Sequence, residues 1–245
     1  MGKPATFRIW RGGPDGGALH DYSSTVEEGM VVLDAVHHIQ AEQAPDLAVR
    51  WNCKAGKCGS CSAEINGMPR LMCMTRLSDL DLNAPVTVEP MHTFPLIRDL
   101  VTDVSWNFRA KKTIRKFNPR LPDAPDGTWR IHQADVDRVQ EFRKCIECFL
   151  CQDVCHVLRE HHKHEEFIGP RLLVYAAALE MHPLDTDDRV SDLRHRHSIG
   201  YCNITTCCRQ VCPESITITE NAIIPLKERV VDRYFDPIKS LFHIL

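Results

Sequence analysis

The strongest constraint on this chain is a four-position cysteine motif that occurs twice in its C-terminal half. The first copy reads Cys145-x2-Cys148-x2-Cys151-x3-Cys155. The second copy lies 57 residues downstream and reads Cys202-x2-Thr205-x2-Cys208-x3-Cys212-Pro213, so that threonine replaces one cysteine. Two copies of one spacing indicate ligands to metal centres, and the missing cysteine indicates that the two centres differ.

This spacing is the ligand pattern of bacterial ferredoxins, in which the fourth cysteine of each run binds the other cluster. The crossover gives a complete ligand set for a [4Fe–4S] cluster: Cys145, Cys148, Cys151 and Cys212. It leaves three thiolates for the other cluster: Cys155, Cys202 and Cys208. A neutral hydroxyl at Thr205 holds iron poorly beside soft thiolates, so the second set predicts a [3Fe–4S] cluster. The chain is therefore predicted to transfer electrons.

A third ligand set lies upstream, with the plant-type [2Fe–2S] spacing. Its members are Cys53, Cys58, Cys61 and Cys73. Gly56 and Gly59 lie between the first three cysteines and allow the positive φ angles that a loop around inorganic sulfide needs. A structural zinc site or disulfides are the alternatives. Zinc favours paired C-x2–4-C knuckles, and C-x4-C-x2-C is not such a pair.

The cysteine content places the thiols in a reducing compartment. Twelve cysteines in 245 residues are about 5% of the chain, below the ~8–10% typical of a disulfide scaffold. The N-terminus lacks the apolar core and cleavage site of a Sec signal, which predicts reduced cytosol. The three ligand sets leave only Cys207 over. It is predicted to be a buried bystander, the alternative being a fourth ligand that turns the [3Fe–4S] site into a second [4Fe–4S] site.

Charge and hydropathy exclude other classes of protein. A net charge of −3 gives no reason to expect nucleic acid as a partner. The longest apolar run, residues 172–179, is far shorter than the ~20 residues of a spanning helix. The basic stretch 109–120 is either a solvated helix face or a docking face for an acidic partner or anionic lipid headgroups.

The predicted fold class is α+β, in two domains. Residues 1–105 are predicted to form a plant-type ferredoxin domain of the β-grasp kind, with the early glycine-rich segment as a turn. Its expected elements are strands at 6–10, 19–26, 62–65 and 86–88, a hairpin turn at Asn66-Gly67 and a helix at 30–43. Residues 106–245 are predicted to form an all-α domain of the bacterial ferredoxin kind. Its expected elements are helices at 134–144, 171–181 and 223–234, a polar segment with short helix at 185–198, a loop at 118–127 and an amphipathic tail.

With three cysteine sets in this order, the chain resembles the iron–sulfur subunit of succinate dehydrogenase and fumarate reductase (complex II). The stretch Phe94-Pro95-Leu96-Ile97-Arg98-Asp99-Leu100-Val101-Thr102-Asp103 adds to the resemblance. The resemblance implies [2Fe–2S], [4Fe–4S] and [3Fe–4S] clusters in a respiratory chain and tricarboxylic acid cycle enzyme. Electrons would pass from FAD on a flavoprotein subunit to a quinone at an integral membrane anchor, with haem b an option in the anchor. The chain would lie peripherally on the cytoplasmic face of the inner membrane.

The sequence departs from the family pattern at the residues that follow Cys155 and Cys202, where the quinone is expected to bind. Many family members have proline after the last cysteine of the first run and histidine after the first cysteine of the second, whereas this chain has His156 and Asn203. A quinone and proton site at His156, Asn203 and Thr205 is therefore predicted to suit menaquinone. The dense group His156, His161, His162 and His164 is either a proton relay or surface and interface packing.

Two other functions remain as alternatives. One is a soluble multi-cluster carrier that exchanges partners freely. The other is the iron–sulfur subunit of a different flavoprotein or disulfide-reducing complex, although such subunits generally lack the N-terminal [2Fe–2S] domain.

Overall fold

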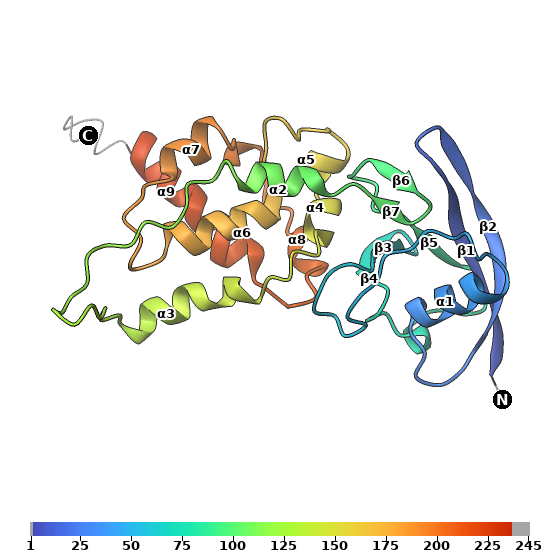
Figure 1. Ribbon diagram of the computed structural model, residues 1–245. Helices are drawn as coiled ribbons and strands as arrows, with labels where there is room; N and C mark the ends of the chain where they lie inside the picture. Colours follow the sequence, from blue (N-terminus) through green and yellow to red (C-terminus); the bar gives the residue numbers. More distant parts are fainter. Residues whose placement is uncertain (1, 237–245) are drawn as a thin grey trace. The chain divides into compact units, whose positions relative to one another are not determined.

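The computed structural model describes residues 2–236, and the chain divides into two units (Figure 1). The first unit combines the residues up to Val104 with two short segments from far downstream, Ile146–Val154 and Val211–Pro213. The second unit holds the remainder. The sequence-based division at residue 105 assigned both short segments to the helical domain. Most of the amphipathic tail (residues 237–245) lies outside the described residues.

A mixed five-stranded sheet forms the centre of the first unit, in the order β2-β1-β5-β3-β4. Strand β1 pairs antiparallel with β2 and parallel with β5, while β3 pairs antiparallel with both β5 and β4. The strands are β1 (Lys3–Gly13), β2 (Gly16–Val26), β3 (Ser62–Ile65), β4 (Met68–Leu71) and β5 (Val86–Glu89).

The alternation of apolar residues explains which face of the sheet is buried. Phe7 and Ile9 of β1 are fully buried, whereas the alternate residues Thr6, Arg8 and Trp10 are partly exposed. Asn66 and Gly67 join β3 to β4 with φ angles of 49° and 73°. Two successive positive φ angles define the type I′ turn, so the predicted hairpin is confirmed.

Helix α1 (Val32–Glu42) packs its apolar face, which includes Val36 and Ile39, in the core of this unit. Its first backbone N–H groups, those of Val32 and Leu33, donate to the carbonyls of Thr75 and Met72. Those hydrogen bonds join the start of the helix to the backbone before and after Cys73. The remaining elements of the unit are η1 (Leu77–Asp79), β6 (Leu96–Arg98), β7 (Val101–Thr102) and α4 (Leu150–Asp153).

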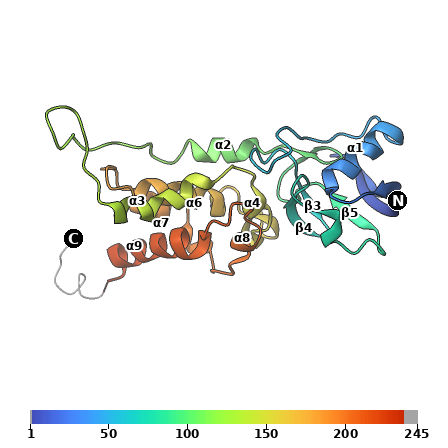
Figure 2. The same ribbon diagram turned by 90° about the horizontal axis from the view of Figure 1, so that it is seen from below.

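All regular elements described in the second unit are helical. Helix α6 begins with Gly169-Pro170, as its proline predicted, and lies between α2 and α9 (Figure 2). The elements are α2 (Ser105–Lys111), α3 (Gln133–Gln140), η2 (Glu141–Lys144), α5 (His156–Arg159), α6 (Gly169–Glu180), α7 (Val190–His195), η3 (Ile199–Tyr201), α8 (Cys207–Gln210), η4 (Ile218–Ile223) and α9 (Ile224–Tyr234). Within the described range, no helix is long and apolar enough to cross a bilayer.

One expected helix and the basic stretch 109–120 differ in detail from the expectations. The helix predicted at 134–144 ends at Gln140 and tightens into the 3₁₀ turn η2. The basic stretch is helical only as far as Lys111. Beyond it, Arg115 pairs with Asp192 and Arg120 pairs with Asp123, so part of its charge is already neutralised within the unit.

A buried ion pair fastens the loop after α2 to the helical core. Arg189 Nη2 lies 2.8 Å from Asp185 Oδ2, and both side chains are about 1% exposed. The same guanidinium donates to the carbonyl oxygens of Arg115 and Lys116. The loop backbone is therefore tied by side-chain hydrogen bonds in place of regular secondary structure.

Candidate iron–sulfur sites

The N-terminal cysteine loop turns its backbone N–H groups toward sulfur. Residues Lys54, Gly56 and Gly59 adopt φ angles of 53°, 66° and 69°, which confirms the predicted left-handed glycines. The N–H groups of Ala55 and Lys57 lie 3.4 and 3.3 Å from Cys53 Sγ. The Cys73 N–H likewise lies 3.5 Å from Cys61 Sγ. Donors in this arrangement stabilise thiolates.

The thiols of this loop have contrasting acidities. Burial opposes ionisation of Cys58, but hydrogen bonds from Ser60 and the loop backbone outweigh it and lower the pKa of Cys58 to about 7. Burial raises the pKa of Cys61 to about 12. Coordination to iron deprotonates such a thiol outright. The four thiols, one of them too buried to ionise alone, fit a [2Fe–2S] cluster.

This loop approaches the first of the two C-terminal cysteine runs closely, within the first unit. A Cβ placed on Gly59 would lie 2.5 Å from the Cα of Cys148, so only glycine fits there without displacement. The Ser62 hydroxyl lies 2.8 Å from the carbonyl oxygen of Gly59 and 2.9 Å from that of Cys148. Sequence reasoning missed Ser62, although its place directly after Cys61 was a signal.

The two C-terminal motifs share one backbone conformation. Glu147 and Phe149 have φ angles of 55° and 63°, and the residues 57 positions later, Ile204 and Thr206, have 61° and 62°. Each loop follows a 3₁₀ helix, η2 or η3, and leads into a four-residue helix, α4 or α8, at the same 57-residue offset. Thr205 therefore stands in the second loop where Cys148 stands in the first.

The second motif borders a cavity in the second unit. Cys155 of the first run lines it together with Cys202 and Cys208 of the second. The cavity itself is small, about 20 Å³, and opens to solvent. The chemistry of its three thiol donors fits a cluster of three irons and four sulfides.

Burial makes two of these thiols weak acids. It raises the pKa of Cys155 to about 11 and that of Cys208 to about 12, and neighbouring thiols add to both shifts. Thr219 Oγ1 lies 3.7 Å from Cys208 Sγ. Bound iron supplies the positive charge that such thiols need in order to ionise.

The ligand set predicted for [4Fe–4S] is divided between the units. Cys148, Cys151 and Cys212 lie in the first unit, and Cys145 ends the preceding segment of the second. None of the twelve cysteines, all within the described range, forms a disulfide. No three His, Cys, Asp or Glu side chains among residues 2–236 converge as they would on a single metal ion. Thiolates around a cluster stand further apart, because they bind different irons.

All three residues of the predicted quinone and proton site, His156, Asn203 and Thr205, line the cavity with the three cysteines. The other histidines of the dense group are placed differently. His164 packs edge-on against the ring of Trp106, and His161 and His162 are exposed. His156 and His161 remain ring neighbours, with centroids 6.2 Å apart.

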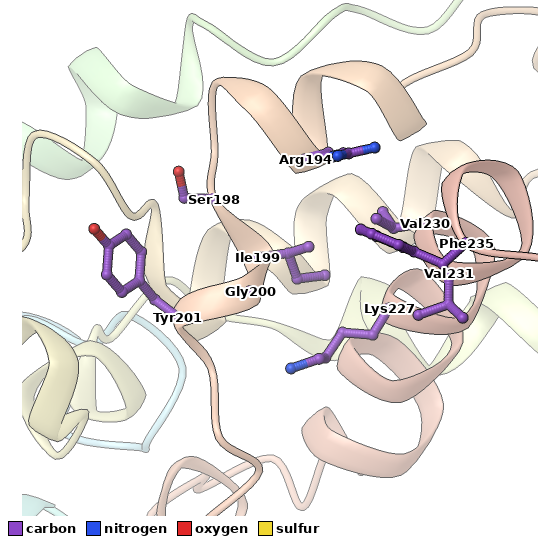
Figure 3. Close-up of a pocket in the computed structure, with 9 residues that line it drawn as sticks. All are labelled: Arg194, Ser198, Ile199, Gly200, Tyr201, Lys227, Val230, Val231 and Phe235. Atoms are coloured by element: carbon purple, nitrogen blue, oxygen red, sulfur yellow. The ribbon is translucent and has the colours of Figure 1, made fainter.

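A second, mostly apolar hollow of about 450 Å³ lies among α7, η3 and α9 (Figure 3). Ile199, Val230 and Phe235 supply apolar walls, and Arg194 and Lys227 are its cations. Lys227 Nζ donates a 2.5 Å hydrogen bond to the carbonyl oxygen of Cys202. Sequence reasoning missed Lys227, although a cation on an amphipathic segment soon after Cys212-Pro213 was a usable signal.

Comparison with known proteins agrees with the two kinds of motif. Residues 6–109 match the model of a 2Fe-2S iron-sulfur cluster binding domain, and residues 141–216 match that of a 4Fe-4S dicluster domain. A chain in the structure of the Mycobacterium smegmatis Sdh1 complex in the apo form is 58% identical, with a TM-score of 0.93. The match covers 97% of this chain and 100% of that one.

Two curated relatives extend the comparison. The fumarate reductase iron-sulfur subunit of Mycobacterium tuberculosis (strain CDC 1551 / Oshkosh) is 34% identical, over 80% of this chain and 79% of its own length. The succinate dehydrogenase iron-sulfur subunit of Paracoccus denitrificans is 26% identical, over 93% of this chain and 88% of its own length.

Proposed function

Because the chain belongs to the iron–sulfur subunits of succinate dehydrogenase and fumarate reductase, it carries electrons, and we propose that it does so through three clusters. The sets are Cys53, Cys58, Cys61 and Cys73 for [2Fe–2S], Cys145, Cys148, Cys151 and Cys212 for [4Fe–4S], and Cys155, Cys202 and Cys208 for [3Fe–4S]. The clusters supply one-electron oxidation and reduction of iron.

One observation carries this proposal. Thr205 occupies the loop position of Cys148, beside a cavity that Cys155 shares with Cys202 and Cys208. The cavity thus joins one cysteine of the first run to two of the second, as a crossover of ligands requires. Three thiols and a hydroxyl favour three irons over four.

The residues around the thiols hold the clusters and exclude water. N–H groups of the loop stabilise Cys53, and burial shields Cys61, Cys155 and Cys208 from solvent. The contact of Gly59 with Cys148 keeps the backbone path between the first two ligand sets short. The strand order and the helix α1 of the first unit support a β-grasp fold, and the helices of the second unit support an all-α ferredoxin fold.

The proposed partners are a flavoprotein subunit that holds FAD and an integral membrane anchor at which quinone reacts. The subunit would then lie on the cytoplasmic face of the membrane. His156, Asn203 and Thr205 border the cavity of the last ligand set, which supports a quinone and proton site there. The cationic and apolar hollow beside Cys202 suits contact with the anchor and its lipids. Menaquinone is the proposed quinone, since His156 and Asn203 replace the residues of the familiar ubiquinone site.

The test of the cluster assignment is electron paramagnetic resonance on the complex purified without oxygen. The oxidised protein is expected to show a [3Fe–4S] signal, and dithionite is expected to reveal [2Fe–2S] and [4Fe–4S] signals. A fully loaded protein without the oxidised signal would contradict the role given to Thr205.

The quinone assignment needs its own test. Replacing His156 by proline and Asn203 by histidine introduces the residues common in the family. The preference for menaquinone over ubiquinone is expected to fall, measured as the ratio of kcat/KM for the two. An unchanged ratio, with the [3Fe–4S] signal intact, would count against a menaquinone site built by these residues.

A further inference from the structure

Cys207 is the one cysteine of twelve that the three cluster assignments do not use. Its side chain is half-buried, so the prediction of a buried bystander is wrong in its burial, and it lines the same cavity as Cys155, Cys202 and Cys208. Four thiols therefore border a cavity in which the proposed cluster uses three. Fe²⁺ is a suitable occupant for the additional ligand, because thiolates hold iron in clusters.

Cys207 lies beside the position where a fourth ligand belongs. Thr205 takes the place that Cys148 has in the first run, and its Oγ1 lies 3.3 Å from Cys207 Sγ. The Cys207 sulfur therefore neighbours the position that a fourth iron ligand would take. The thiolate is the stronger iron ligand of the two side chains.

We propose that Cys207 is a reserve ligand through which the three-iron cluster takes up a fourth iron as Fe²⁺. This inference rests on the proposed function, because it requires a [3Fe–4S] cluster in the cavity. One electron from the preceding clusters first reduces [3Fe–4S]⁺ to [3Fe–4S]⁰. Addition of Fe²⁺ then gives [4Fe–4S]²⁺, a bond forms between iron and Cys207 Sγ, and the thiol proton leaves to solvent. Iron, sulfide and charge balance in both steps.

The consequence is an electron carrier that responds to iron. Cluster type and net charge set the reduction potential of an iron–sulfur site. Uptake of iron would therefore change the potential of the last cluster and slow delivery of electrons to the quinone. Loss of Fe²⁺ from [4Fe–4S]²⁺ would return [3Fe–4S]⁰ with protonation of Cys207 Sγ, and transfer of one electron to the quinone would restore [3Fe–4S]⁺.

The test uses the intact complex, reduced with dithionite and incubated with ⁵⁷Fe²⁺. The wild type is expected to lose most of the [3Fe–4S] signal that reoxidation otherwise restores, and to gain one ⁵⁷Fe per chain in a Mössbauer spectrum of a [4Fe–4S] cluster. Cys207→Ser and Cys207→Ala are expected to keep the signal and to take up no ⁵⁷Fe at this site.

The outcomes separate this inference from the proposed function. A starting protein without a [3Fe–4S] signal contradicts the proposed function itself. A signal that is present but unaffected by Fe²⁺, or uptake that is equal in Cys207→Ala, overturns the reserve ligand and leaves the function standing. Loss of the signal in Cys207→Ala before any Fe²⁺ is added overturns it too, since Cys207 would then be a resident ligand.

Discussion

The hydroxyl of Ser62 and the carbonyl oxygen of Cys148 lie 2.9 Å apart, although 86 residues separate them in the chain. This hydrogen bond joins the edge of the [2Fe–2S] loop to the segment Ile146–Val154 inside the first unit. It is buried, and it works beside the close approach of Gly59 to Cys148. Two ligand loops from distant parts of the chain are thereby held in one rigid contact.

Ser62→Ala is expected to loosen the segment Ile146–Val154. Loss of a buried hydrogen bond costs about 1 kcal/mol, so amide hydrogen exchange in this segment should be several-fold faster in the intact complex. The control is Ser78→Ala, which removes an exposed hydroxyl of the same unit. Equal exchange in both variants would show that Ser62 contributes nothing to the contact.

Thr205→Cys is expected to turn the three-iron cluster into a four-iron cluster. The variant places a thiolate at the loop position of Cys148, on a backbone that already matches. The oxidised [3Fe–4S] signal should disappear, and a second [4Fe–4S] signal should appear on reduction. Thr205→Ser keeps a hydroxyl and should keep the three-iron signal. Persistence of that signal in Thr205→Cys would mean that position 205 does not face the cluster.

Arg189→Met is expected to destabilise the second unit strongly. The change leaves Asp185 without its buried cation, and breaking a buried pair in this way costs about 3–5 kcal/mol. The matched control is Arg115→Met, which removes an ion pair whose arginine is half exposed and which should cost less than about 1 kcal/mol. The measurement is the urea midpoint of the helical circular dichroism signal. Similar midpoints in the two variants would refute a special role for Arg189.

The stability of the second unit should fall as the pH drops below about 6.5, partly through His197. This side chain is 2% exposed, and burial lowers its pKa, with Arg196 acting in the same direction and Asp192 opposing. The unfolded chain therefore binds a proton that the folded chain rejects, so the free energy of unfolding decreases below the unfolded pKa. Between pH 7.5 and pH 5.5 the loss from this group is at most about 1.4 kcal/mol, the limit reached when the folded group binds no proton in that range.

The check on His197 is the difference in urea midpoint between pH 7.5 and pH 5.5. His197→Phe keeps an aromatic ring, removes the titrating group and should show a smaller difference than the wild type. His195→Phe, at an exposed position, should behave as the wild type does. An undiminished pH effect in His197→Phe would assign the sensitivity to other groups.

Local sequence patterns predicted the elements that depend on the conformational preferences of one or two residues. The hairpin at Asn66-Gly67 and the start of α6 at Pro170 both follow from the conformational preferences of those residues. The hairpin of β6 and β7 was not predicted. Asp99, at its turn, accepts hydrogen bonds from the N–H groups of Gly12 and Ala48, which are remote in sequence. Hydrogen bonds between residues so far apart in sequence cannot be predicted from a local pattern.

The cysteine spacing yields the proposed ligand sets, but it does not predict how the loops are shaped. The left-handed residues Glu147, Phe149, Ile204 and Thr206 include no glycine, so their conformations could not be read from residue type. The position of Cys207 beside Thr205 also depends on the folded loop. The cysteine spacing identifies candidate ligands, whereas only the folded structure shows which thiols line the same cavity.

The discontinuous first unit has a consequence for how the protein is made. Its sheet and the four cysteines of the [2Fe–2S] set are synthesised by residue 89, but its last segment, Val211–Pro213, follows much later. The contact partner of Gly59 and Ser62 is Cys148, which follows Cys73 by 75 residues. At ~5–20 residues per second those residues take about 4 to 15 s on the ribosome, and during that interval the surface around Gly59 and Ser62 has no covering segment. The nascent chain thus has time to receive its first proposed cluster before the ligand sets of the other two are complete.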